Sequence, residues 1–387
     1  MKDQLTWAEI DLAAIANNVS ELRRITNARA RLLVAVKANA YGHGAAEVAQ
    51  TALKHGADAL GVARLQEGIE LREAGLTAPV LVFGYTPPSR TADLDKYNLT
   101  QTIYSLATAE AMSAVAVARG SKIPVHLKVD TGMGRLGMLP DSRRYAATGM
   151  PPEKKAIDDV RAIYALAGLE LEGVMTHFAT ADSRDKTYAR EQFACFQEFL
   201  AALDQAGIAV PVKHAANSGA IIDMPETHLD MVRAGISLYG LYPSDEVAKR
   251  RLTLKPAMTL KTRIINLKRV PAGFKVSYGC TYATPAPTTI ATVALGYADG
   301  YNRLLSSRGY MLVHGYKVPI VGRVCMDLTM LDVGNVSEMA LEDEVVAFGC
   351  QDQAEITVDE IARQLNTINY EVVATITKRV PRRFIGA

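Results

Sequence analysis

Residues 31–37 read Arg-Leu-Leu-Val-Ala-Val-Lys, an apolar run that ends abruptly in a basic side chain. A continuous apolar run is typical of a strand buried on both faces of a parallel sheet. Similar runs recur about every 25 to 35 residues, with helical spacing between them, over 57–63, 78–83, 100–104, 125–130, 172–177, 212–216 and 231–236. Eight strand–helix units predict an α/β fold with a (β/α)8 TIM-type barrel. The alternative, an open doubly wound sheet, has no need of eight units.

The pattern changes after Tyr242. Strand-like segments then follow one another closely, over 258–270, 289–295, 310–313, 318–321, 328–333 and 344–348. Only Val358–Asn366 has helical spacing in this stretch. We therefore expect the barrel to occupy residues 11–244 and a mostly β C-terminal domain to occupy residues 245–387.

Composition and charge exclude several classes of protein. The chain has 387 residues, with 43 Lys or Arg against 41 Asp or Glu, which is too balanced for a nucleic-acid-binding surface. No apolar run approaches the roughly 20 residues that span a bilayer, and the first residues lack the apolar stretch of a secretory signal. The four cysteines form no CxxC pair and the histidines have no metal-ligand spacing. We expect a cytoplasmic protein with no metal and no contact with membrane or nucleic acid.

Four predicted strand ends carry unusual polar residues, at the carboxyl edge where barrels place functional groups. Lys37 ends the first strand, Lys128 and Arg135 end the fifth, His177 ends the sixth and Arg233 lies on the eighth. By position alone, Lys37 either extends its amine to solvent or acts as a Schiff-base lysine. In the second case partial burial and nearby arginines would lower the pKa of its amine.

A phosphate site near strands seven and eight would complement the lysine. Asn217-Ser218-Gly219 follows strand seven, and Arg233-Ala-Gly235-Ile236 belongs to strand eight. Backbone N–H groups and the Ser218 hydroxyl suit a phosphate, although ordinary turns use the same residues. A lysine beside a phosphate site indicates pyridoxal phosphate (PLP), which carries an aldehyde and a phosphate on one ring.

The segment Val34-Ala-Val-Lys-Ala-Asn-Ala-Tyr-Gly-His-Gly44 resembles the PLP-lysine signature of the alanine racemase family. Further segments resemble that family in the same order along the chain, at 126–137, 176–182, 214–218, 232–236, 277–279, 296–300 and 322–327. The resemblance spans nearly the whole chain. It implies a PLP-binding barrel, a β domain and a homodimer with shared active sites. It also implies that residues 1–10, with the strand Thr6–Ile10, join the β domain.

The resemblance assigns two catalytic bases. Lys37 would hold PLP as an aldimine and then move one proton, while Tyr278 of the partner subunit would act from the opposite face of the substrate. Racemisation needs two opposed groups, so that a proton leaves one face and returns to the other. His177 and Arg233 would help Tyr278 to ionise, and Arg233 would leave the pyridine nitrogen unprotonated. By position alone, Tyr278 is a half-buried strand tyrosine and Arg233 an ion-pair partner at the barrel rim.

Other family roles concern the cofactor and the substrate carboxylate. Arg135 would bind the PLP phenolic oxygen and the substrate carboxylate, and the backbone N–H of Met326 would reach the carboxylate from the partner subunit. Lys128, often carbamylated in the family, would position Arg135; a plain Lys128 paired with Asp130 is the alternative. The resemblance further implies that the phosphate and the approach to the active site are lined by Tyr41, Ser218, Gly235, Ile236 and Tyr297.

Two segments depart from the family pattern. Pro140–Lys155 is longer than the usual link after strand five, and its polar, Pro-rich composition predicts a surface loop. Lys378 stands where the family usually has a tyrosine that touches the phosphate and supports the catalytic tyrosine. The resemblance thus predicts an alanine racemase that supplies D-alanine for peptidoglycan. Because of Lys378, a broader racemase that acts on serine or larger amino acids is the alternative.

Overall fold

The computed structural model describes residues 4–140 and 156–386. The chain forms two compact units. The barrel unit consists of Ile15–Ala40 and Ala45–Lys255, and the β unit consists of Met1–Ala14, Tyr41–Gly44 and Pro256–Ala387.

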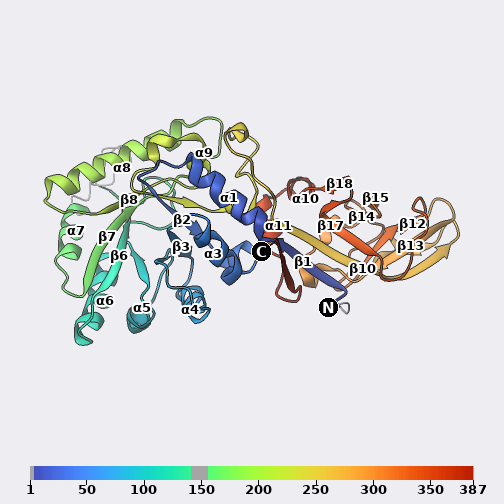
Figure 1. Cartoon of the computed structure of the whole chain (residues 1–387), viewed down its shortest axis with the longest axis horizontal. Coiled ribbons are helices and arrows are strands. Elements are labelled where there is room, and N and C mark those ends of the chain that lie inside the picture. The colour runs from blue at the N-terminus through green and yellow to red at the C-terminus, as the bar shows by residue number, and fades with distance from the viewer. Residues whose placement is uncertain (1–3, 141–155, 387) are drawn as a thin grey trace. The chain divides into compact units, whose positions relative to one another are not determined.

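Eight parallel strands form the barrel unit (Figure 1). They are β2 (Arg31–Ala35), β3 (Ala59–Val62), β4 (Val80–Val82), β5 (Thr100–Ile103), β6 (Ile123–Lys128), β7 (Leu169–Met175), β8 (Val212–His214) and β9 (Met231–Ala234). Neighbouring strands pair in the order β8-β7-β6-β5-β4-β3-β2-β9. Backbone hydrogen bonds from Asp230 N, just before β9, to Lys213 O and from Arg233 N to Ala216 O, just after β8, bring these two strands side by side. The predicted barrel is confirmed, and each predicted apolar run overlaps one of its strands.

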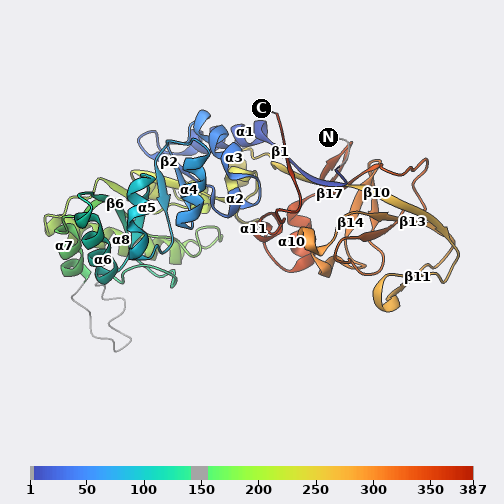
Figure 2. The same cartoon turned by 90° about the horizontal axis from the view of Figure 1, so that it is seen from below.

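Helices lie outside these strands (Figure 2). They are α1 (Leu12–Ile25), α3 (Ala45–Lys54), α4 (Leu65–Glu73), α5 (Thr91–Lys96), α6 (Leu106–Ala118), α7 (Ala156–Tyr164), α8 (Thr187–Gln205) and α9 (Ser218–Asp223), with short 3-10 helices at Pro88–Arg90, Pro225–Thr227, Ile236–Tyr239 and Lys249–Arg251. The apolar face of α8 buries Phe196, Phe199 and Leu203. Within the described ranges, no helix is long and apolar enough to cross a membrane.

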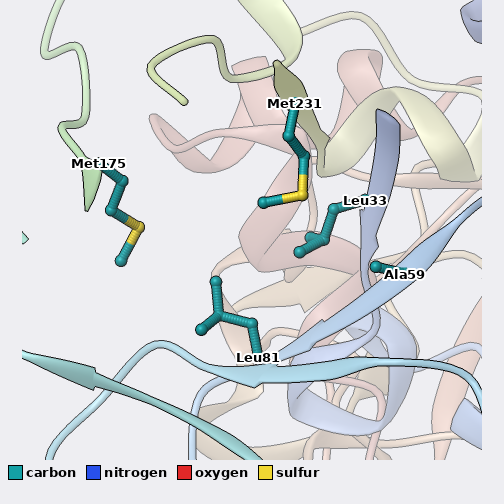
Figure 3. Close-up of a cluster of buried hydrophobic side chains, with 5 residues drawn as sticks. All are labelled: Leu33, Ala59, Leu81, Met175 and Met231. Atoms are coloured by element: carbon teal, nitrogen blue, oxygen red, sulfur yellow. The ribbon is translucent and has the colours of Figure 1, made fainter. Parts of the chain in front are cut away.

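The barrel interior contains a cluster of buried apolar side chains, drawn in Figure 3: Leu33, Ala59, Leu81, Met175 and Met231. The strands therefore face this interior on one side and the helices on the other. Burial on both sides explains why the strand sequences are continuously apolar rather than alternating.

The β unit is built on β10 (Met258–Val270), which pairs antiparallel with β1 (Thr6–Asp11), β13 (Thr288–Val293) and β17 (Glu344–Gln351). β1 also pairs in parallel with the last strand, β19 (Arg382–Ile385). The other strands are β11 (Lys275–Val276), β12 (Tyr282–Ala283), β14 (Tyr310–Val313), β15 (Tyr316–Pro319), β16 (Thr329–Asp332) and β18 (Ala354–Ile356).

The helices of the β unit correct one expectation. The predicted helix is present as α10 (Val358–Leu365), capped by the Thr357 side chain, which accepts a hydrogen bond from Glu360 N. A second helix, α11 (Asn369–Ala374), follows directly, so the prediction of a single helical stretch was wrong. Three short 3-10 helices also occur, at Tyr278–Cys280, Tyr297–Asp299 and Arg303–Leu305. At six residues, α11 is too short for its apolar spacing to stand out in the sequence.

Candidate active site

Lys37 begins a segment of unusual backbone at the carboxyl end of β2. This segment, α2 (Lys37–Tyr41), has left-handed geometry, with φ between 52° and 53° at Ala38, Asn39, Ala40 and Tyr41. Left-handed backbone costs an L residue roughly 1–2 kcal/mol, so the turn must be held by its surroundings. Lys37 itself is partly buried, and burial, followed by the charge of Arg135, lowers the pKa of its amine.

Glu67 holds the start of this turn and was not predicted from the sequence. Its Oε1 accepts a hydrogen bond from Ala38 N at 2.7 Å, while its Oε2 accepts from Ala63 N at 2.7 Å and Arg64 N at 3.0 Å. One carboxylate thus ties the residue after Lys37 to the end of β3 and the start of α4. The available signal was an acidic residue in the first turn of a helix, which usually indicates only a capping role.

The end of the turn is held within the β unit. Arg382 Nε donates to Gly42 O at 2.8 Å, and the Tyr41 ring lies 6.2 Å from the Tyr370 ring, centroid to centroid. Gly42 has a φ of +86°, and a Cβ atom there would lie 2.4 Å from Val373 O. Only glycine satisfies both constraints at this position.

Lys128 is a buried lysine at the end of β6. Burial, with the charges of Arg135 and Arg233, lowers the pKa of its amine to about 8. The Asp130 carboxylate instead shapes the loop that follows: its Oδ1 accepts from Gly132 N, Met133 N and Gly134 N at 2.8–3.1 Å, and its Oδ2 accepts from Arg135 N at 3.2 Å. Within the described ranges Lys128 forms no ion pair with Asp130.

Arg233 occupies the centre of a buried hydrogen-bond network and is 5% exposed. Its guanidinium donates to the carbonyl oxygens of Thr176 at 2.7 Å and Ala215 at 2.9 Å. It also donates to Nδ1 of His214 at 2.8 Å and Nδ1 of His177 at 3.3 Å. Burial and the charge of Arg135 lower the pKa of Arg233 to about 9, so it stays protonated at neutral pH.

The contacts of Arg233 determine which nitrogen atoms of two further histidines carry protons. A guanidinium only donates, so His214 Nδ1 accepts and the proton of this neutral imidazole sits on Nε2. His214 Nε2 then donates to His126 Nδ1 at 2.8 Å, which places the His126 proton on its own Nε2. Burial lowers the pKa of both rings, that of His126 to about 4. The sequence analysis gave His126 and His214 no role in the site, although each begins a segment that resembles the family.

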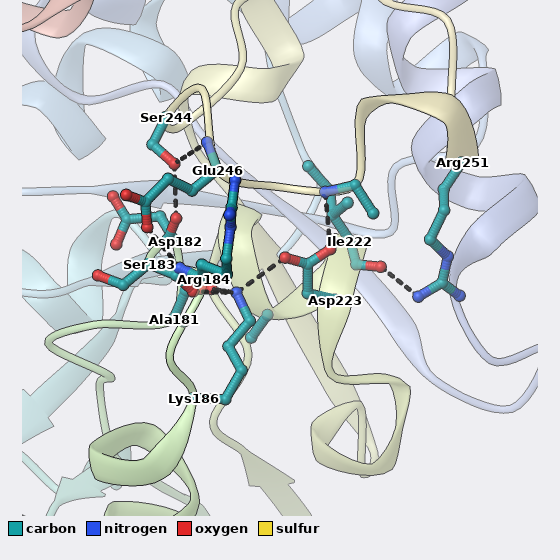
Figure 4. Close-up of polar contacts among 12 residues, drawn as sticks. Ala181, Asp182, Ser183, Arg184, Lys186, Ile222, Asp223, Ser244, Glu246 and Arg251 are labelled. Carbon is teal, nitrogen blue, oxygen red and sulfur yellow. Dashed lines mark hydrogen bonds and ion pairs between the residues drawn. The ribbon is translucent and has the colours of Figure 1, made fainter.

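His177 lies two residues after the end of β7, and the loop that follows it is held by polar contacts (Figure 4). Gln192 Nε2 donates to His177 O at 3.1 Å. Lys186 Nζ donates to Ala181 O, Ser183 O and the Asp223 carboxylate at 2.6–2.8 Å. Burial, followed by the charge of Arg233, holds the pKa of His177 well below its usual value, so this ring is neutral.

Of the five residues predicted to line the phosphate and the approach to the active site, Ser218, Gly235 and Ile236 lie together in the barrel unit. Ser218 is buried, and its Oγ accepts a hydrogen bond from Gly235 N at 2.8 Å. Ile236 follows directly as the first residue of a 3-10 helix. At Gly219 a Cβ atom would lie 2.9 Å from backbone atoms of Ala181, so the absence of a side chain allows the two loops to touch.

Tyr278 lies in the β unit, on the loop between β11 and β12, and is 75% exposed. Figure 2 shows this loop projecting from the sheet of the β unit. Ser277 before it has a φ of +64° and a ψ of −176°, a region that is essentially restricted to glycine and costs about 1–3 kcal/mol. The Ser277 hydroxyl donates to Arg323 O at 2.8 Å, which helps to hold this conformation.

Met326 and Tyr297 lie on two loops that are joined by backbone hydrogen bonds. Tyr297 N donates to Cys325 O at 3.0 Å, and Ala298 N donates to Met326 O at 3.0 Å. Both side chains are exposed, Met326 by 53% and Tyr297 by 41%. The β unit therefore presents Met326, Tyr297 and Tyr278 to solvent.

Of the two departures from the family pattern, Lys378 lies among the described residues, whereas the segment Pro140–Lys155 lies almost entirely outside them. Lys378 is exposed, and its neighbour Arg379 forms an ion pair with Asp327, with 2.8 Å between Nη2 and Oδ1. Of Pro140–Lys155, only Pro140 belongs to the described residues. The predicted surface loop therefore lies outside the described residues and stays a prediction.

Comparison with known proteins identifies the family. Residues 10–243 match the family described as alanine racemase, N-terminal domain, and residues 257–384 match alanine racemase, C-terminal domain. A protein from Desulfosudis oleivorans named alanine racemase is 57% identical over 99% of this chain and 97% of its own. A solved alanine racemase from Clostridium difficile matches with a TM-score of 0.91 and 41% identity, over 99% of this chain and 96% of that chain. One from Bartonella henselae "with covalently bound pyridoxal phosphate" matches with a TM-score of 0.85 and 26% identity, over 99% and 100%. This chain belongs to the alanine racemase family.

Proposed function

We propose that this protein interconverts L-alanine and D-alanine with PLP as its cofactor. The observation that carries the proposal is Lys37, a half-buried lysine of lowered pKa at the carboxyl end of a barrel strand, in the family's lysine motif. The names of its relatives support alanine as the substrate. They give no support to a broader racemase, and that alternative is not retained.

The residues at the barrel strand ends fit the cofactor. A lysine of lowered pKa retains a larger neutral fraction, which is the form that attacks an aldehyde. Ser218, Gly235 and Ile236 would hold the phosphate, with Tyr41 beside them, and Arg233 would contact the ring nitrogen. When bound, PLP supplies the aldehyde and the ring that accepts electrons from the substrate Cα.

The protein's own contribution is to move a proton from one face of the substrate to the other. Lys37 would act on one face, and Tyr278 of a second copy of the chain on the other. Arg135 and the backbone N–H of Met326 would orient the substrate carboxylate. Nδ1 of the neutral His177 accepts from Arg233, so the proton of this ring sits on Nε2, which is suited to donate a hydrogen bond rather than to add charge.

A carbamylated Lys128 is part of the proposal. Carbon dioxide reacts with neutral amines, and a pKa of about 8 leaves part of Lys128 neutral near neutral pH. The resulting anion would lie close to the positive charges of Arg135 and Arg233. The alternative ion pair with Asp130 is disfavoured because the Asp130 oxygens already accept four backbone N–H groups.

The proposed biological setting is cell-wall synthesis. D-alanine is a building block of peptidoglycan, so the enzyme would supply this synthesis from the cytoplasm. The scattered cysteines suit a reducing compartment. A homodimer would bring Tyr278 and Met326 of one chain to the Lys37 of the other.

Borohydride reduction tests the cofactor assignment. The purified protein should be yellow, and reduction should fix PLP covalently on the peptide that contains Lys37. Peptide mapping by mass spectrometry gives the position, and Lys37→Ala, reduced in the same way, is the control that should carry no label. A label on any other lysine of the wild-type protein contradicts the assignment.

A further inference from the structure

A cavity outside the proposed cofactor site lies in the barrel unit, at the amino ends of the strands. Its volume is about 250 Å³. The residues that begin six strands contribute to its lining: Arg31, Ala59, Val80, Thr100, Val212 and Met231. Because the proposed cofactor site uses the carboxyl ends of the same strands, this cavity is separate from it. Nothing in the proposed function uses it.

One wall of the cavity is apolar. Leu33, Ala59, Leu81 and Met231 are buried and line it. In Figure 3 the side chains of Leu33, Leu81 and Met231 point toward a common space. Side chains normally fill the interior of an eight-stranded barrel. Here part of that interior is empty beside apolar side chains, so it can accommodate an apolar group of a ligand.

The rim of the cavity carries charges of both signs. Arg31 and Glu170 are exposed, whereas Glu172 is half-buried. In the part of the chain that the structure describes, these three side chains make no hydrogen bond or ion pair with the protein. A nearby third carboxylate, Asp58, is already engaged, because its Oδ2 accepts from Leu32 N at 2.7 Å. The rim thus offers one cation and two carboxylates that do not neutralise one another by direct contact.

His126 adds a buried donor to the lining. Its side chain is 6% exposed, and its Nδ1 accepts from His214 in the network that begins at Arg233. Nε2 must therefore carry the proton, and it has no partner among the described residues. Nε2 is not sealed from solvent, and His126 lines the cavity, so this N–H can donate a hydrogen bond to a ligand there.

We propose that this cavity binds a zwitterionic α-amino acid with an apolar side chain. Arg31 and His126 Nε2–H would hold the carboxylate, Glu172 and Glu170 would hold the ammonium group, and the side chain would pack against Leu81 and Met231. A simple anion would face two carboxylates and a simple cation would face Arg31. A zwitterion satisfies both signs at once.

The test is a calorimetric titration of L-leucine into the borohydride-reduced holoenzyme, in which reduced PLP occupies the active site. Saturable binding of one leucine per chain is expected. Leucinol, which lacks the carboxylate, and 4-methylpentanoate, which lacks the ammonium group, should each bind about tenfold more weakly or not at all.

Two variants locate the binding. Ala59→Leu fills the cavity and should abolish binding, and Glu172→Gln removes one charge at nearly constant volume and should weaken it about tenfold. Glu73→Gln, an exposed change on α4, is the matched control and should bind like the wild type. If Ala59→Leu does not fold, Glu172→Gln decides alone.

Three results would overturn the inference. They are the absence of saturable binding to the wild-type protein, binding that Glu172→Gln leaves unchanged, and binding of 4-methylpentanoate as tight as that of leucine. None of these results bears on whether Lys37 carries PLP.

Discussion

Arg233 and Tyr278 differ in how far a single chain buries them and supplies them with hydrogen-bond partners. Arg233 is 5% exposed, and its guanidinium contacts four acceptors from its own barrel. Tyr278 is 75% exposed and follows a residue with strained backbone. The barrel half of the proposed site is therefore preorganised, whereas the proposed tyrosine half presents its functional group to solvent. Such a division is what an active site shared between two copies of the chain requires.

The exposed side chains on the loops near Tyr278 are largely apolar, which supports a site shared between two copies of the chain. Met326, Leu328 and Tyr297 are also exposed, on neighbouring loops of the β unit. Exposed aromatic and methionine side chains are enriched in protein–protein interfaces. Substitutions in each half should show whether the two halves contribute as differently as their surroundings indicate.

The largest effect is expected from Tyr278→Phe. Loss of one of two opposed bases should lower racemisation by roughly a hundred- to ten-thousandfold while PLP stays bound. The remaining base, Lys37, serves one face, so the Cα hydrogen of D-alanine should exchange with solvent faster than that of L-alanine. Deuterium incorporation measured by NMR gives both rates.

Tyr282→Phe is the matched control for this experiment, because Tyr282 lies on the adjacent β12 and donates to Asp332 at 3.4 Å. It should racemise alanine almost normally. Equal residual exchange of the two enantiomers in Tyr278→Phe would refute the assignment of the two bases to opposite faces.

A smaller effect is expected from Glu67→Gln. The amide keeps one acceptor for Ala38 N but replaces the acceptor of Ala63 N and Arg64 N, so the turn after Lys37 should loosen. A tenfold loss of kcat corresponds to about 1.4 kcal/mol, the scale of one or two hydrogen bonds. Removal of the negative charge also lowers the pKa of Lys37, since the carboxylate opposes the lowering by burial.

The pH dependence of PLP uptake by the apoprotein separates this positioning role from a general loss of stability. The midpoint of uptake should shift to lower pH in Glu67→Gln and stay in place in Glu70→Gln, an exposed change on the same helix. If both variants keep the wild-type midpoint, Glu67 does not act on Lys37.

An effect on folding stability rather than on activity is expected in acid. His126 has a pKa of about 4 in the folded protein against 6.5 for an ordinary histidine, so the unfolded chain binds more protons between these values. Stability should therefore fall as the pH falls from about 6.5 to about 4, by at most about 3 kcal/mol from this residue. His126→Gln should flatten this part of a denaturation profile recorded against pH. A profile as steep as that of the wild type would show that His126 does not titrate in this way.

The sequence predicted the barrel strands well because each strand is buried on both faces and therefore appears in the sequence as a short, continuous apolar run. Lys37, His177 and Arg233 were singled out for a similar reason, since a basic residue is conspicuous at the end of such a run; their roles in the site stay predictions. The left-handed turn from Ala38 to Tyr41 was not predicted. Three of its residues are neither Gly nor Asn, and its conformation is held by partners distant in sequence, such as Arg382.

Glu67, His126 and His214 were missed for a related reason. Each lies where the sequence alone indicates an ordinary helix or strand residue, and its contacts to the site come from chain segments far away. His126 and His214, for example, are 88 residues apart and meet only because β6 and β8 belong to one barrel. Side-chain networks of this kind depend on tertiary packing, which hydrophobic periodicity does not encode.

Subunit mixing tests most directly whether the active site is shared between two chains. Lys37→Ala and Tyr278→Ala, each inactive alone, are mixed under conditions in which native mass spectrometry confirms subunit exchange. A mixed dimer contains one site with both native residues, so random exchange should restore roughly a quarter of wild-type activity. If activity stays absent after exchange is confirmed, Lys37 and Tyr278 act within one chain, and the assignment of Tyr278 to the partner's active site is wrong.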